Sequence, residues 1–249
     1  MRIASDVAGD GPPLVMVHGA GSSRVTFDLV RPHLEARFTV WAVDRRGRGD
    51  SDDGKPYELA QEFEDVAAVV RAAGPDALLY GHSYGALVAA GAATGLDGLP
   101  KLVLYEPPMG GVLVDEEWTQ RFEASVNADG RSSAVREFMR DVGGYTDEQI
   151  DLMEGTPAWQ ARLEVSPTVP RELRAERALS IDSLALAAIA APTLLLVGSE
   201  SPPWARRSTE AFAAAIPGAE VRTLHGHGHG AATSGPELLA AEVERFLAG

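Results

Sequence analysis

The sequence of 249 residues contains no cysteine. This absence excludes a disulfide framework, a thiolate metal site and a cysteine nucleophile. Lysine is nearly absent as well, because only Lys55 and Lys101 stand among 22 basic residues. A chain so rich in arginine and alanine is typical of a GC-rich bacterial coding sequence.

Long apolar runs are also missing, and none reaches the roughly 18 residues that a membrane-spanning helix needs. The first residues lack the apolar centre of a signal peptide, so a cytoplasmic location is expected. The 36 acidic residues outnumber the 22 basic ones and give a net charge of −14. Nucleic acids and anionic membranes repel such a surface, so neither is expected as a partner. A small-molecule substrate remains the expected partner, and the oligomeric state stays open.

Short aliphatic runs alternate with helical patterns along most of the chain. The strongest runs, typical of strands buried on both faces, are residues 14–17, 38–43, 77–80, 102–105 and 192–198. Residues 221–224 are the expected last strand. Leu59, Phe63, Val66 and Val70 recur at helical spacing before Gly74. Strands that alternate with helices predict a mostly parallel sheet covered on both faces, an α/β fold with its site at the carboxyl ends of the strands.

A pentapeptide of the form G-x-S-x-G, Gly81 to Gly85, lies between one of these strands and a helix of small residues. In this context a sharp turn holds the central serine in a strained conformation with its hydroxyl exposed above the sheet. Ser83 is therefore the predicted nucleophile.

Three other segments accompany this pentapeptide in a characteristic order. His18-Gly19-Ala20-Gly21 follows the first buried strand, a loop from Asp44 to Ser51 follows the next, and Gly226 to His229 lies near the end. With these landmarks the chain resembles the α/β-hydrolases over nearly its whole length. The resemblance implies a cofactor-free hydrolase that bears a helical cap.

A serine nucleophile needs a base, and the resemblance assigns this role to His229 in the loop after the last strand. His225, His227 and His229 alternate, and such spacing can also place imidazoles on one side of a metal ion. No nearby acidic residue or cysteine completes a ligand set, so we expect no metal.

The acid that orients the histidine is less certain from sequence, because Ser201 occupies the position where the resemblance implies an aspartate. Two residues could replace it. Glu106 ends the strand after the Ser83 helix, a position from which some haloalkane dehalogenases take their acid, and Glu200 lies one residue before Ser201. We favour Glu106 and keep Glu200 as the alternative.

Backbone amides of Ala20 and Tyr84 are the expected oxyanion-hole donors.

Aliphatic runs typical of strands are absent between residues 109 and 186, so we expect a core of residues 1–108 and 187–249 and a helical cap at 109–186. Ser234 and Glu237 predict a capping box at the start of the last helix.

These features together predict a serine hydrolase that cleaves an ester-like or related acyl bond through an acyl-enzyme. The same fold and triad also serve C–C bond hydrolysis, thioester hydrolysis and lyase chemistry, and these alternatives stay open. A ligand-binding protein that has lost turnover is the remaining alternative, since no aspartate stands at Ser201.

Overall fold

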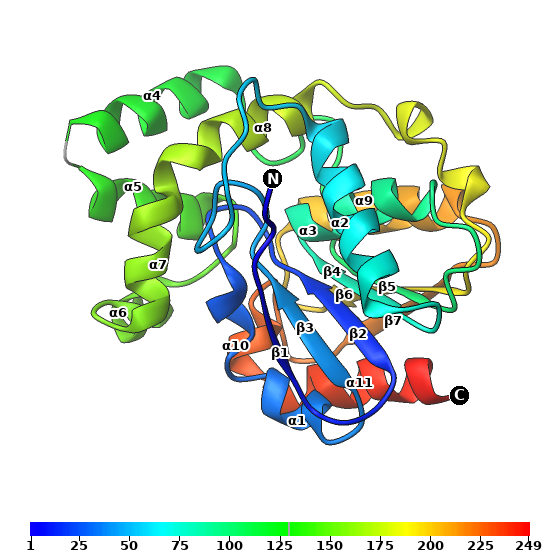
Figure 1. The fold of residues 1–249 in the computed structure, drawn as a ribbon. Helices are drawn as coiled ribbons and strands as arrows, with labels where there is room; N and C mark the ends of the chain where they lie inside the picture. The colour runs from blue at the N-terminus through cyan, green and yellow to red at the C-terminus, as the bar shows by residue number, and fades with distance from the viewer. Residues whose placement is uncertain (129) are drawn as a thin grey trace.

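A computed structural model describes residues 1–128 and 130–249. The sheet has the strand order β1-β3-β2-β4-β5-β6-β7, and only β1 runs antiparallel to its neighbour (Figure 1). Its strands are β1 (Ser5–Ala8), β2 (Pro13–Val17), β3 (Thr39–Val43), β4 (Leu78–His82), β5 (Leu102–Tyr105), β6 (Thr193–Gly198) and β7 (Glu220–Leu224). The predicted mostly parallel sheet is confirmed.

Alternate residues of the central strands enter two separate apolar layers. In β2, Val15 and Val17 join one buried cluster, while Leu14 and Met16 join the other. All four side chains are excluded from solvent, which is why the strand reads as a continuous apolar run.

Helices cover both faces of the sheet, as Figure 1 shows. One layer contains α1 (Arg31–Glu35), α10 (Ala231–Ser234) and α11 (Pro236–Ala248). The opposite layer contains α2 (Leu59–Ala73), α3 (Tyr84–Ala93) and α9 (Pro203–Ala215). The predicted end of α2 is confirmed, because Gly74 caps it with a φ of 125°. No helix in the described part of the chain is long and apolar enough to cross a bilayer.

Between β5 and β6 the chain forms a helical segment that lies over one end of the sheet (Figure 1). Its α-helices are α4 (Glu116–Asn127), α5 (Arg131–Asp141), α6 (Asp147–Met153), α7 (Pro157–Val165) and α8 (Val169–Arg177). The same segment contains three short 3₁₀ helices, η2 (Ser166–Thr168), η3 (Ile181–Leu184) and η4 (Leu186–Ala188). A further 3₁₀ helix, η1 (Arg24–Phe27), lies between β2 and α1. Phe122 and Leu173 of this segment belong to the same apolar cluster as Leu79 of the sheet, so the two parts share one core.

The predicted capping box at Ser234 is wrong. Ser234 is the last residue of α10, and Gly235 is the N-cap of α11 without any side-chain cap. Pro236 starts α11, and the Ser234 hydroxyl instead lies 3.3 Å from Nδ1 of His227. The short helix α10 leaves no extended residue at position 234 to act as a cap.

Candidate active site

Ser83 occupies the turn between β4 and α3 with a φ of 55° and ψ of −126°. This region is rarely populated by residues other than glycine and costs about 1–3 kcal/mol. The neighbouring glycines explain how the turn closes. A Cβ on Gly81 would collide with the backbone of Gly85 and Ala86, and one on Gly85 with the carbonyl of Val17. The strand and helix therefore approach closely enough to fix the serine.

His229 and Glu106 meet at the carboxyl edge of the sheet. Nδ1 of His229 lies 2.5 Å from Oε2 of Glu106, and both side chains are buried. A carboxylate can only accept, so Nδ1 carries the proton and Nε2 is left free as an acceptor. The acid favoured from sequence thus lies against the histidine.

The other oxygen of Glu106 is also satisfied. Oε1 accepts from the Gly198 amide at 2.7 Å and from the Ser201 hydroxyl at 2.5 Å. Three donors therefore surround a fully buried carboxylate, as such a group requires. Ser201, at the position where an aspartate was expected, hydrogen-bonds Glu106 instead of contacting His229.

Glu200 lies elsewhere, exposed on the loop after β6. Its amide donates to the carbonyl of His227 at 3.0 Å, and no hydrogen bond joins its carboxylate to His229 among the described residues. The backbone of Glu106, with a φ of 50°, aims its own side chain under the histidine.

The loop that carries His229 is held by two residues of the sheet. Nε2 of His82 lies 2.9 Å from the carbonyl of His229, and the Tyr105 hydroxyl donates to the carbonyl of Gly228. The ring of Trp204 also packs edge-to-face with the imidazole of His229, and the two ring centroids lie 5.1 Å apart. Burial, and then the electrostatic effect of the adjacent His229 ring, hold the pKa of His82 well below its usual value. His82 therefore stays neutral and braces the loop.

The alternating histidines do not converge. His225 is exposed, and His227 faces Ser234. In residues 1–128 and 130–249 no group of three histidine or acidic side chains could hold a metal ion.

A comparison with known proteins fits this architecture. A model of the alpha/beta hydrolase family matches residues 14–242. The chain belongs to the α/β-hydrolase family. A solved α/β-hydrolase from Sphaerobacter thermophilus is 33% identical, has a TM-score of 0.81, and covers 98% of this chain and 95% of its own.

Curated relatives of this α/β-hydrolase are named enzymes. A pimeloyl-[acyl-carrier protein] methyl ester esterase from Stenotrophomonas maltophilia is 29% identical over 257 residues, covering 98% of this chain and 95% of the relative. An N-formylmaleamate deformylase from Pseudomonas putida is 37% identical over 107 residues, 41% of this chain and 40% of the relative. The α/β-hydrolase described here is therefore a hydrolytic enzyme.

The loop after β2 lies beside Ser83 in this α/β-hydrolase. A Cβ on Gly19 would lie 3.0 Å from the Ser83 Cβ and 3.5 Å from its Oγ. Within the described residues, neither the Ala20 amide nor the Tyr84 amide donates to another backbone carbonyl outside the regular elements. Tyr84 is the first residue of α3, where amides have no partner within the helix.

Buried side chains hold this loop in place. Nδ1 of His18 lies 2.9 Å from the carbonyl of Gly19, and its Nε2 accepts from the Arg45 amide at 3.1 Å. Burial, and then the charge of Arg45, keep the pKa of His18 well below its usual value, so it stays neutral. The Arg45 guanidinium donates to the carbonyls of His18 and Gly19 at 2.9 Å each.

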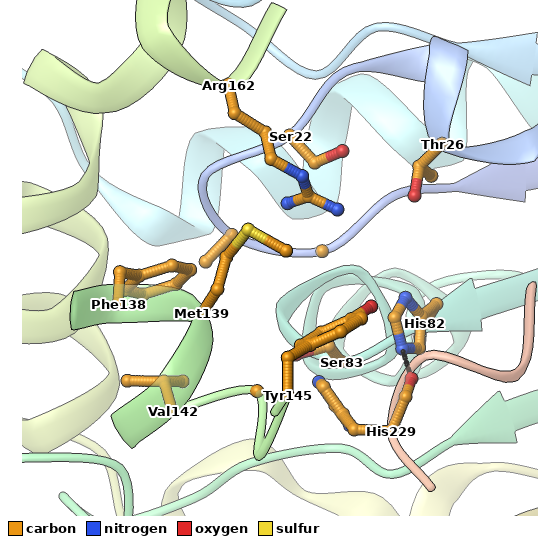
Figure 2. A pocket seen from close by; sticks show the side chains of 13 residues that line it. Ser22, Thr26, His82, Ser83, Phe138, Met139, Val142, Tyr145, Arg162 and His229 are labelled. Carbon is orange, nitrogen blue, oxygen red and sulfur yellow. Dashed lines mark hydrogen bonds between the residues drawn. The ribbon is translucent and has the colours of Figure 1, made fainter. Parts of the chain in front are cut away.

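Two neighbouring cavities are lined by residues of both the helical segment and the rest of the chain. The inner pocket, about 40 Å³, contains Ser83 and His229 (Figure 2). Its lining is Gly19, Ala20, Ser22, Thr26, His82, Ser83, Phe138, Met139, Val142, Gly143, Tyr145, Arg162 and His229. The outer cavity, about 650 Å³, shares Thr26, Gly143, Tyr145, Arg162 and His229 with it and opens past Leu29 and Leu152.

Sequence reasoning missed Tyr145 and Arg162, which form the boundary between the two cavities. Tyr145 packs against Gly230, where a Cβ would clash with its hydroxyl. No motif surrounds either residue. Among the apolar residues of the helical segment, Phe138 and Met139 line the inner pocket and Met153 lines the outer cavity.

Proposed function

We propose that the enzyme is a serine hydrolase that cleaves carboxylic esters or related acyl bonds of small molecules. Ser83 would act as nucleophile, His229 as base and Glu106 as the acid of the triad. The observation that carries this proposal is the 2.5 Å contact between Nδ1 of His229 and Glu106, with Ser83 and His229 lining one small pocket. The esterases among the relatives of the chain support the same bond type.

In the first step, Nε2 of His229 takes the proton of the Ser83 hydroxyl as Oγ adds to the carbonyl carbon. The carbonyl π electrons move to oxygen, and the amides of Ala20 and Tyr84 would stabilise the oxyanion. Each such donor contributes about 10²–10³ in rate. The intermediate then collapses, the bond to the leaving group breaks, and His229 returns the proton to that group.

In the second step, a water molecule gives a proton to His229 and adds to the acyl-enzyme carbonyl. Collapse of this intermediate releases the acid and restores the Ser83 hydroxyl with the proton from His229. Glu106 accepts from Nδ1 throughout and stabilises the imidazolium that forms twice in each turnover. Its three hydrogen bonds keep the carboxylate in place for this task.

The helical segment at 109–186 is proposed to act as a cap that limits substrate size. Phe138, Met139 and Val142 of α5 and its end form the apolar wall of the inner pocket (Figure 2). A pocket of about 40 Å³ accepts only a small acyl group next to Ser83, while the outer cavity of about 650 Å³ has room for a larger leaving group.

The alternative of a ligand-binding protein without turnover rests on the absence of an aspartate at Ser201. The position of Glu106 against His229 supports a complete triad over that alternative. C–C bond hydrolysis, thioester hydrolysis and lyase chemistry would need the same three residues, and no observation favours them over ester cleavage.

The test is steady-state hydrolysis of a panel of small methyl and p-nitrophenyl esters. We expect Ser83→Ala and His229→Ala each to lower kcat by about 10⁴-fold or more, because triad members act as a unit. His227→Ala is the matched control and should retain activity, since His227 contacts Ser234 and lies outside the inner pocket. An active His229→Ala variant beside an inactive His227→Ala variant would refute the assignment of the base.

A further inference from the structure

Arg162 brings a positive charge into the inner pocket from α7. Its Nη1 donates to the carbonyl of Gly21 at 3.2 Å, while its Nε is buried without a hydrogen-bond partner. Figure 2 shows the guanidinium extending from the helix into the pocket, toward the side where Ser83 and His82 lie. Within residues 1–128 and 130–249, no carboxylate forms an ion pair with it.

Other partly buried arginines of the same segment are paired. Arg171 contacts Asp53 at 2.9 Å, and Arg177 contacts Glu116 at 2.5 Å. A guanidinium that is partly removed from water without a counter-charge is costly, and an anionic ligand would remove that cost. Arg162, which lines both the inner pocket and the outer cavity, is therefore a suitable binding partner for an anionic ligand.

The two walls of the inner pocket differ in chemistry. Phe138, Met139 and Val142 line one side, while Arg162 lies near the hydroxyls of Ser22 and Thr26 on the other (Figure 2). Of the residues that line this pocket, Arg162 alone carries a permanent charge. A carboxylate is the common acyl substituent that a guanidinium binds with two parallel hydrogen bonds.

We infer that the substrate carries a carboxylate close to the scissile carbonyl and that Arg162 binds it. This inference rests on the proposed function and adds the substrate class, a half-ester or half-amide of a short dicarboxylic acid. Arg162 contacts Gly21, next to Ala20, so its charge lies beside the predicted oxyanion hole. A carboxylate held there places the neighbouring carbonyl near Ser83.

The outer cavity restricts where this carboxylate lies. Asp28 and Glu200 line that cavity and would repel a second anionic group. Short diacids, with the two carboxyl groups a few bonds apart, therefore fit better than long ones, whose free carboxylate would reach the acidic outer wall.

The experiment compares two esters of equal size, monomethyl succinate and its neutral amide, methyl succinamate. The wild type should favour the anion in kcat/KM, and Arg162→Gln should lower kcat/KM for the anion by about 10–100-fold, the usual range for a hydrogen bond to a charged group. The neutral ester should change by less than about threefold. Arg121→Gln, which removes the same charge from an exposed site on α4, should leave both values unchanged.

Two results would overturn the inference. One is an equal loss for both esters, which would make Arg162 a support for the loop or the oxyanion. The other is no preference for the anion in the wild type. Arg162→Lys should keep part of the preference, because it keeps the charge but loses the paired geometry.

A binding measurement separates this inference from the proposed function. Succinate should raise the Tm of the wild type and of Ser83→Ala, but not that of Arg162→Gln, and succinamide should shift none of them. If no ester is cleaved but succinate stabilises in an Arg162-dependent way, the proposed function fails and the anion site stands. If esters are cleaved and succinate has no effect on Tm, the anion site fails alone.

Discussion

In the proposed triad, the carboxylate of Glu106 accepts a hydrogen bond from Nδ1 of His229 and orients the imidazole. Glu106→Gln keeps the size of the side chain but removes the charge that stabilises the imidazolium, and it permits the wrong tautomer. We expect kcat to fall by about 10³–10⁴-fold with little change in Tm, measured by steady-state ester hydrolysis and thermal unfolding.

Two residues of the loop after β6 serve as comparisons. Ser201→Ala removes one of three hydrogen bonds to Glu106 and should lower kcat by about 10-fold, the value of a hydrogen bond to a charged group. Glu200→Gln should change kcat by less than about twofold, because its carboxylate is exposed. A large loss for Glu200→Gln with an active Glu106→Gln would reverse the choice of acid.

The places of Ser83 and His229 in the fold could be predicted from sequence because each residue lies in a local pattern, while their catalytic roles stay predictions. Glu106 could be ranked first but not chosen with certainty, since the contact depends on the register of β5 with β6 and on the positive φ of Glu106. Arg162 and Tyr145 could not be predicted, because their places depend on how the helices between β5 and β6 pack on the sheet. Helical periodicity does not encode that packing.

At the scale of elements, buried ion pairs connect the loop after β3, helix α2 and helix α8. Arg45 donates to Glu62 of α2 at 2.9 Å and pairs with Glu172 of α8, and all three side chains are buried. Glu172 also accepts from the Gly21 amide at 3.4 Å. This network fixes the predicted oxyanion loop to the helical segment.

Glu172→Gln should therefore lower the free energy of unfolding by about 3 kcal/mol, because it leaves a buried guanidinium partly uncompensated. It should also lower kcat, since the loop loses an anchor. Denaturant unfolding measures the first effect. Glu117→Gln is the control, with a side chain that is 84% exposed, and should change stability by less than about 0.5 kcal/mol. Equal stability for both variants would show that the network does not hold the segment.

The positions of the strands could be predicted from sequence where both faces of the strand are buried. The apolar runs of β2, β4, β5 and β6 marked the strands because helices cover them on both sides. The capping box at Ser234 failed because helix α10 uses that residue, and a four-residue helix leaves no periodic signal.

At the scale of the whole molecule, both parts of the chain build the proposed active site. The sheet supplies Ser83, Glu106 and His229, and the helical segment supplies Tyr145 and Arg162. The division of the chain at residues 109 and 186 stays a prediction, and side chains of both parts belong to one apolar cluster.

The most direct test of the account is labelling of the intact protein with a fluorophosphonate, followed by intact-mass measurement and peptide mapping. We predict one adduct per chain, on Ser83, no adduct in Ser83→Ala, and a labelling rate at least about 10²-fold lower in Glu106→Gln, because the unsupported histidine is a weaker base. Absence of labelling in the folded wild type, an adduct on another serine, or an unchanged rate in Glu106→Gln would contradict the proposed triad.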